Sequence, residues 1–220
     1  FRDGASSALP SIRWVNNSNI WLVPELIRQN EAEQKELFHA LTGPWMGKDK
    51  RRGFPYSWLP SHLADARGDV SPRSFLAAVH YSASIDQRVN QEYLLHYESI
   101  KQGVQEASRI RVAELEEDYP WVKQLFAPLA GITVPCHFTE ISDIWKSKKV
   151  IGQLQKQIEN SSLTEGVRLP PIHIAEGEDG ILIDLINLGL VEQLKDDRIN
   201  LPDVYRVGYK MGRRGGVKPK

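Results

Sequence analysis

Apolar residues along the first part of the chain recur at the spacing of amphipathic helices. Leu37, Phe38 and Leu41 fall on one helical face after Asn30, whose side chain is of a type that caps helix starts, and Gly43 predicts the end of that helix. Further helices are expected at residues 58–68, from Pro72 onward, from Ser99 to about residue 118, and at 120–129. Residues 18–131 are therefore predicted to form a helical bundle.

The pattern changes after Gly131. Residues 132–140 read as an extended linker, and a charged helix is expected near residues 143–160. Apolar residues then return at helical spacing in residues 178–188, ahead of a Leu-Gly-Leu turn.

Two segments after this turn, residues 198–201 and 204–211, alternate apolar and polar residues like strands. A helix, a turn and a hairpin in this order are typical of the second half of a winged helix. We therefore predict a mainly α chain with two domains. A helical lid-like bundle occupies residues 1–131, and a linker and winged helix with a basic C-terminal tail occupy residues 132–220.

The composition of the chain limits which partners and which cellular compartment we expect for it. The 220 residues include 28 basic and 28 acidic side chains, so no overall charge attracts nucleic acid or a membrane. The single cysteine, Cys136, cannot form an internal disulfide, which suits a reducing cytoplasm. No apolar run approaches the ~20 residues that cross a bilayer. The chain opens at Phe1 with neither an initiator Met nor an apolar leader, so we expect a cytoplasmic fragment without membrane contact.

Complete catalytic and metal motifs are absent from the sequence. GPWMGKDK at residues 43–50 differs from a P-loop, because only three residues separate its glycines and Asp49 follows the lysine. A basic surface loop is the simpler interpretation. His137 adjoins Cys136 without a second ligand pair at zinc-type spacing. We therefore predict no catalytic residue and no metal ligand in this chain.

Arg73 is the best single candidate for a binding residue. It follows Pro72 in the first turn of a predicted helix, where a cation is unfavourable by about 0.3–1 kcal/mol. Arg73 either points into solvent or contacts an anion shared with the helix end, such as a nucleotide phosphate.

The segment WLPSHLADARGDVSPRSFL, at residues 58–76, resembles the lid of bacterial P-loop ATPases of the AAA+/STAND type. SRIRVAELEEDYPWVKQLFAPLAG and LIDLINLGLVEQLKDDRINLPDVYRVGYKMGRRGGVKP resemble the region after that lid and the C-terminal winged helix of the same proteins. By this resemblance Arg73 corresponds to a sensor arginine near the ATP phosphates.

The resemblance implies ATP and Mg for the full-length protein, but no cofactor for this chain alone. The Walker A, Walker B and sensor 1 motifs are absent here, so an upstream nucleotide-binding domain or another subunit would supply them. The family implies a homo-oligomer in a regulated assembly, often one that defends bacteria against phage or other foreign DNA.

A winged helix raises two alternatives, a DNA-binding regulator and a protein-interaction adaptor that uses no nucleotide. No Lys or Arg lies between Arg168 and Lys195, and Glu176, Glu178, Asp179 and Asp184 would repel DNA phosphates. Nonspecific nucleic acid or an acidic partner would instead contact the basic C-terminal segment. Its cations are Arg206, Lys210, Arg213, Arg214, Lys218 and Lys220.

Overall fold

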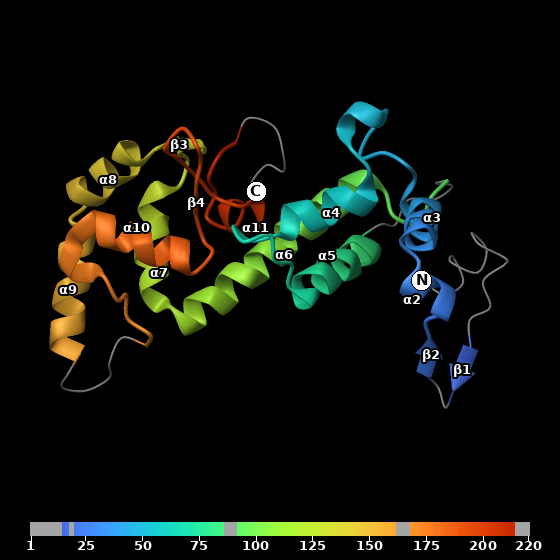
Figure 1. Ribbon diagram of the computed structural model, residues 1–220, viewed down its shortest axis with the longest axis horizontal. Helices are drawn as coiled ribbons and strands as arrows, with labels where there is room; N and C mark the ends of the chain where they lie inside the picture. Colours follow the sequence, from blue (N-terminus) through green and yellow to red (C-terminus); the bar gives the residue numbers. More distant parts are fainter. Residues whose placement is uncertain (1–14, 18–19, 86–91, 162–167, 214–220) are drawn as a thin grey trace. The chain divides into compact units, whose positions relative to one another are not determined.

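The computed structural model describes residues 15–17, 20–85, 92–161 and 168–213, and helices dominate it, as predicted (Figure 1). The helices are α2 (Glu25–Gln29), α3 (Glu31–Thr42), α4 (Pro55–Leu63), α5 (Pro72–Ile85), α6 (Tyr97–Asp118), α7 (Pro120–Phe126), α8 (Phe138–Ser147), α9 (Val150–Ser161), α10 (Gly177–Asn187) and α11 (Asp203–Arg206). Three 3-10 helices are η1 (Lys50–Arg52), η2 (Ala127–Leu129) and η3 (Ile174–Glu176). The strands are β1 (Val15–Asn17), β2 (Ile20–Leu22), β3 (Cys136–His137), β4 (Glu192–Gln193) and β5 (Arg198–Asn200).

Contacts along the chain define two compact units. The first unit comprises residues 1–61 and 76–103, and the second comprises residues 62–75 and 104–220. Neither unit begins or ends at residue 131, where the sequence predicts a domain boundary. Residues on both sides of residue 131 share one hydrophobic core, which a boundary there would divide.

The first unit contains the helix whose ends the sequence predicts best. The Asn30 side chain accepts hydrogen bonds from the backbone N–H groups of Ala32 and Glu33, which confirms it as the cap of α3. Gly43 ends α3 with a φ of 76°, a conformation that favours glycine. An antiparallel hairpin of β1 and β2 precedes these helices.

The second unit ends in the predicted winged-helix-like arrangement. Strand β3 precedes α8, α9 and α10, and the β4–β5 hairpin follows them. The three strands form an antiparallel sheet in the order β3-β5-β4, with Ile199 of β5 paired to Cys136 on one side and to Gln193 on the other. The mainly helical fold with a small C-terminal sheet is thus confirmed.

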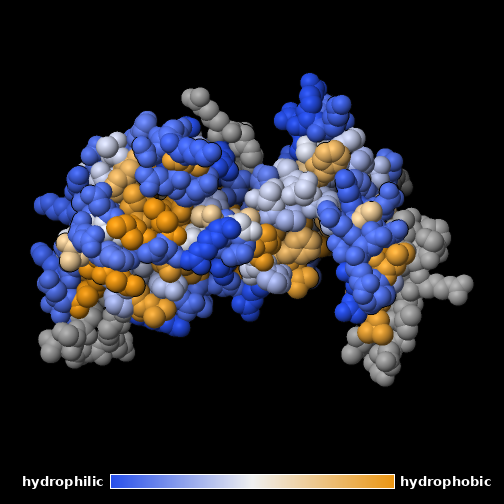
Figure 2. Space-filling model, in the orientation of Figure 1, coloured by the Kyte–Doolittle hydropathy of each residue, from blue (hydrophilic) through white to orange (hydrophobic). Residues whose placement is uncertain are grey.

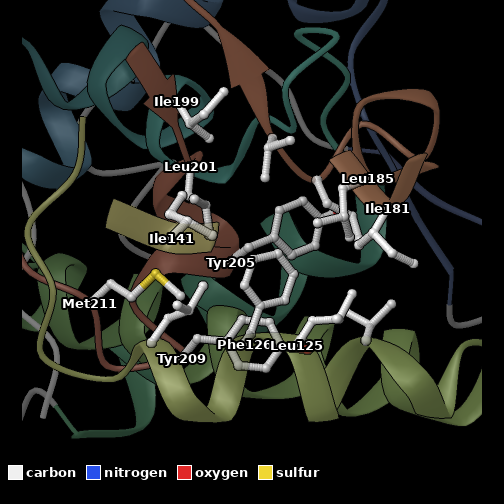
Figure 3. Close-up of a cluster of buried hydrophobic side chains, with 14 of the residues drawn as sticks. Leu125, Phe126, Ile141, Ile181, Leu185, Ile199, Leu201, Tyr205, Tyr209 and Met211 are labelled. Atoms are coloured by element: carbon white, nitrogen blue, oxygen red, sulfur yellow. The ribbon is translucent and has the colours of Figure 1, made fainter. Parts of the chain in front are cut away.

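The core of the second unit joins α7, α10 and the C-terminal segment. Leu125 and Phe126 lie against a layer that includes Leu185 and Tyr205 (Figure 3). The rings of Phe126 and Tyr209 stack with centroids 4.7 Å apart. Burial of these side chains removes apolar surface from water and fixes the helices around the sheet.

Residues 132–140 are not the linker that the sequence predicts. Val134 and Cys136 are buried, and β3 pairs with the central strand of the sheet. The charged helix predicted near residues 143–160 is in fact two helices, α8 and α9. The chain turns between them at Lys149, whose φ is 52°.

Three predicted element boundaries also differ. Residues 204–211 contain α11 and a turn rather than a strand, and residues 204–207 are all buried, so the apparent alternation has no exposed side. Helix α4 spans Pro55–Leu63 rather than residues 58–68, and α6 begins at Tyr97 rather than Ser99. Both helix starts were mispredicted because no Ser, Thr, Asp or Asn cap precedes Pro55 or Tyr97 directly.

Candidate functional site

Arg73 lies in the first turn of α5, where the sequence predicts it. Its side chain is 75% exposed, and one guanidinium nitrogen lies 2.7 Å from a carboxylate oxygen of Glu114 on α6. Glu114 also pairs with Arg111 at 3.6 Å. The arginine is thus held at the surface by a carboxylate that it shares with a second cation.

This ion pair leaves Arg73 available for another anion. Exposed ion pairs contribute about 0–1 kcal/mol, because water screens the charges and ordering long side chains costs entropy. The positive end of the α5 dipole adds a partial positive charge near the same place. An anionic group at this helix end would meet both features.

Arg206, expected among the exposed cations of the tail, is instead completely buried. Its Nε donates to Asp203 at 2.8 Å and its Nη1 donates to the carbonyl of Met211 at 2.9 Å. A buried guanidinium requires such partners, since a charge without them is very costly inside a protein. Arg206 is therefore a core residue and not a contact for nucleic acid.

Arg213 belongs to the same buried network. It donates to Asp203 at 2.9 Å and to the side-chain oxygen of Asn200. His62 approaches the other carboxylate oxygen of Asp203 at 3.5 Å. The prediction that Arg213 contacts a partner does not fit this position, since its guanidinium already closes the C-terminal segment onto β5.

Lys210 is the one cation of the predicted basic set that is exposed within the described residues. It lines a hollow of about 160 Å³ that Arg109 also lines. Arg214, Lys218 and Lys220 lie outside the described residues, so their predicted role stays a prediction.

The helix before the hairpin, α10, and the segment that leads into it present acidic and apolar residues. Glu176 and Asp179 are exposed, as are Ile183 at 41% and Ile172 at 84%. Figure 2 shows hydrophobic side chains gathered over α10. This surface offers carboxylates and no Lys or Arg, so closely spaced DNA phosphates would be repelled by it.

Asp184 is not part of this exposed acidic face, although the sequence suggests it. It is buried and accepts hydrogen bonds from the backbone N–H of His173 at 2.9 Å and from the His173 ring at 2.7 Å. The hydrogen bond with Asp184 raises the pKa of His173 above its usual value. Asp184 therefore anchors the segment that leads into α10.

The sequence predicts the basic surface loop that begins at residue 43, but it does not predict the hollow beside this loop in the first unit. Loop cations and residues from the start of α6 line a hollow of about 680 Å³. The cluster of Lys48, Arg51 and Arg52 was visible in the sequence. Lys101, about 50 positions further along, gave no signal that it belongs with them.

No group of three or more His, Cys, Asp or Glu side chains is placed to hold a metal within the part of the chain that the structure describes. Cys136 is buried, and burial raises the pKa of its thiol to about 11. The neutral thiol is a poor nucleophile and metal ligand at neutral pH.

Comparisons with protein-family models, with curated proteins and with solved structures found no match to this chain. Among the described residues, no helix is both long enough and apolar enough to cross a membrane.

Proposed function

We propose that this chain is the nucleotide-sensing and assembly portion of a P-loop ATPase, and that Arg73 contacts an ATP phosphate in the complete assembly. The proposal rests on the resemblance of residues 58–76 to a lid segment and on the position of Arg73. A largely exposed guanidinium at the start of a 14-residue helix is suited to an anion. ATP and Mg would be held mainly by an upstream domain or another subunit, since this chain has no Walker motifs.

The winged-helix-like end serves in this proposal as a contact for protein in a homo-oligomer. Exposed Ile172 and Ile183 beside Glu176 and Asp179 are better suited to a protein surface than to closely spaced phosphates. A DNA-binding regulator is the second candidate, and it would depend on Lys210 and on the tail cations Arg214, Lys218 and Lys220. Membership of a cytoplasmic antiphage system belongs to the same proposal and rests on the resemblance alone.

The role of Arg73 is tested by ATP turnover of the complete assembly. Arg73→Ala removes a charge that stabilises the transferring phosphate, so turnover is expected to fall about 10²- to 10³-fold, the typical loss for one preorganised donor. Arg73→Lys keeps the charge without the planar guanidinium and is expected to be intermediate.

Arg109→Ala is the matched control. Arg109 is also on a helix surface, is 68% exposed and pairs with Glu106 at 2.7 Å, much as Arg73 pairs with Glu114. Turnover of the Arg109 variant should stay within about twofold of wild type, as expected for a surface change away from the site. Equal turnover of the Arg73→Ala variant and wild type in a correctly assembled complex would refute the proposal.

A further inference from the structure

The first unit contains a cationic hollow between the loop after α3 and the start of α6. Among the described residues that line this hollow of about 680 Å³, Lys48, Arg51, Arg52 and Lys101 are basic, and Asp49 and Glu98 are acidic. Arg51 is already paired with Asp49 at 2.8 Å. Four basic and two acidic side chains leave a net charge of +2, because Lys48, Arg52 and Lys101 face one further carboxylate, Glu98.

The backbone shapes the hollow around Arg52. A Cβ on Gly47 would lie 2.8 Å from Cγ of Arg52, so the missing side chain at residue 47 lets the arginine lie against the loop. The N–H of Met46 donates to the carbonyl of Gly53 at 2.8 Å and closes the loop at its base. The basic side chains of this loop therefore project from a turn that the Met46–Gly53 hydrogen bond closes. In Figure 2 the η1 turn is a strongly hydrophilic projection.

A second hollow, of about 500 Å³, adjoins the first and shares Gly47 and Tyr97 with it. Its lining includes four ring side chains, Trp45, Tyr93, His96 and Tyr97. The Tyr93 ring lies against Gly43, where a Cβ would come within 2.9 Å of it. The rings of His96 and Tyr97 are 4.1 Å apart between centroids.

We infer that these two adjoining hollows form one binding site for single-stranded nucleic acid, with phosphates in the cationic hollow and unstacked bases in the aromatic hollow. Basic side chains next to aromatic rings are the combination by which proteins hold single strands without reading their sequence. Tyr97 lies at the junction, where its ring can stack with a base while the cations contact the adjacent phosphates.

A single strand fits this arrangement better than a duplex does. Bases of a duplex are stacked and paired, so their flat faces cannot reach Tyr93, His96 or Tyr97. Lys48 and Arg52 line the hollow and are exposed, so they are accessible to the phosphates of a strand that runs past it. This site is independent of Arg73 and of the proposed nucleotide sensing.

The inference is tested by fluorescence anisotropy of the whole chain with labelled oligothymidylate and oligouridylate of about 20 nucleotides, longer than typical site sizes. Both are expected to bind, and a duplex of equal length is expected to bind at least tenfold more weakly. The triple variant Lys48→Gln, Arg52→Gln, Lys101→Gln should weaken binding at least tenfold. It should also reduce the slope of log affinity against log salt by about 2, at ~0.7 per single-strand phosphate contact.

Two further sets of variants separate this site from general charge effects. Lys146→Gln, Lys148→Gln and Lys156→Gln remove the same charge from exposed positions in and beside α8 and α9 and should change affinity by less than about twofold. Tyr97→Leu should weaken binding about tenfold, whereas Tyr97→Phe, which keeps the ring, should bind like wild type.

Four results would overturn the inference: no binding of either oligonucleotide, wild-type affinity in the Lys48, Arg52, Lys101 variant, equal affinity for single strand and duplex, or effective competition by thymidine monophosphate. Loss of binding on changing Arg214, Lys218 and Lys220 to Gln, with no loss in the hollow variant, would place the contact in the tail instead.

Discussion

Single residues in the second unit show how position decides the role of a charge. Arg73 and Arg206 are both arginines near helix ends, yet one is 75% exposed and the other completely buried. Arg206 is held by Asp203, which also binds Arg213. The sequence presents Arg206 as one of a run of tail cations, and only its packing shows that it stabilises the core.

Removal of the shared carboxylate should therefore be costly. Asp203→Ala removes the buried carboxylate that Arg206 and Arg213 share. We expect the free energy of unfolding to fall by about 3–5 kcal/mol, as when one partner of a buried ion pair is lost. Urea denaturation measures this loss. The control is Asp196→Ala, which breaks the exposed pair with Arg198 and should cost about 0–1 kcal/mol. Similar losses in the two variants would contradict the burial of this network.

The contact between His173 and Asp184 predicts a pH dependence. Because Asp184 favours the charged imidazolium in the folded state, the pKa of His173 lies above its usual value of 6.5. The stabilisation from this pair is thus fully present below pH 6.5 and is lost as the pH rises through the raised pKa. An NMR titration should show the raised pKa in wild type and a fall toward 6.5 in Asp184→Asn. A wild-type pKa at or below 6.5 would be inconsistent with the bond.

Elements that depend on neighbouring residues are the ones that the sequence predicts correctly. Helix α3 begins after its Asn30 cap and ends at Gly43, and α5 begins at Pro72, because each signal acts within one or two turns. Strand β3 was missed, since its partner β5 is distant in sequence and two paired residues have no pattern of their own. The segment Val204–Val207 was predicted as part of a strand because Arg206 was taken as an exposed polar residue among apolar ones. In the structure all four residues are buried, so the alternation is only apparent.

Gly103 has two effects on α6 that the sequence alone cannot separate: a low helix propensity and room for a close neighbour. As a glycine within α6 it weakens the helix prediction, but a Cβ there would lie 2.2 Å from both the Ala78 carbonyl oxygen and Ser82 Oγ of α5. The missing side chain permits this close approach of two helices. The cost in helix propensity is offset by packing.

Gly103→Ala should lower the free energy of unfolding by about 1–3 kcal/mol, the range for overpacking, despite the better helix propensity of alanine. Gly152, within α9, has no atom within 4 Å of a Cβ position, so Gly152→Ala should instead stabilise by about 1 kcal/mol. Thermal unfolding of the two variants measures whether each change lowers or raises the free energy of unfolding. A stabilising Gly103→Ala change would show that the helices do not approach as described.

At the scale of the whole molecule, the two compact units differ from the two domains that the sequence predicts. The second unit combines residues 62–75 with residues 104–220, and the contact is specific: the N–H of Ala66 donates to the carbonyl of Gly189, and Arg67 donates to the carbonyl of Asn187. Local patterns cannot show such a pairing, because they report which face of an element is apolar and not which distant element covers it. The position of Arg73 in the first turn of α5 was nevertheless predicted, because that signal lies within one helix start.

The central claim is that this chain senses nucleotide through Arg73 without forming the nucleotide site itself. Isothermal titration with Mg-ATP tests this claim most directly. The chain alone should give no binding heat in the micromolar range, and the complete assembly should bind Mg-ATP, more weakly when Arg73 is changed to Ala. Micromolar binding of Mg-ATP by the chain alone, or unchanged affinity of the assembly with Arg73→Ala together with unchanged turnover, would contradict it.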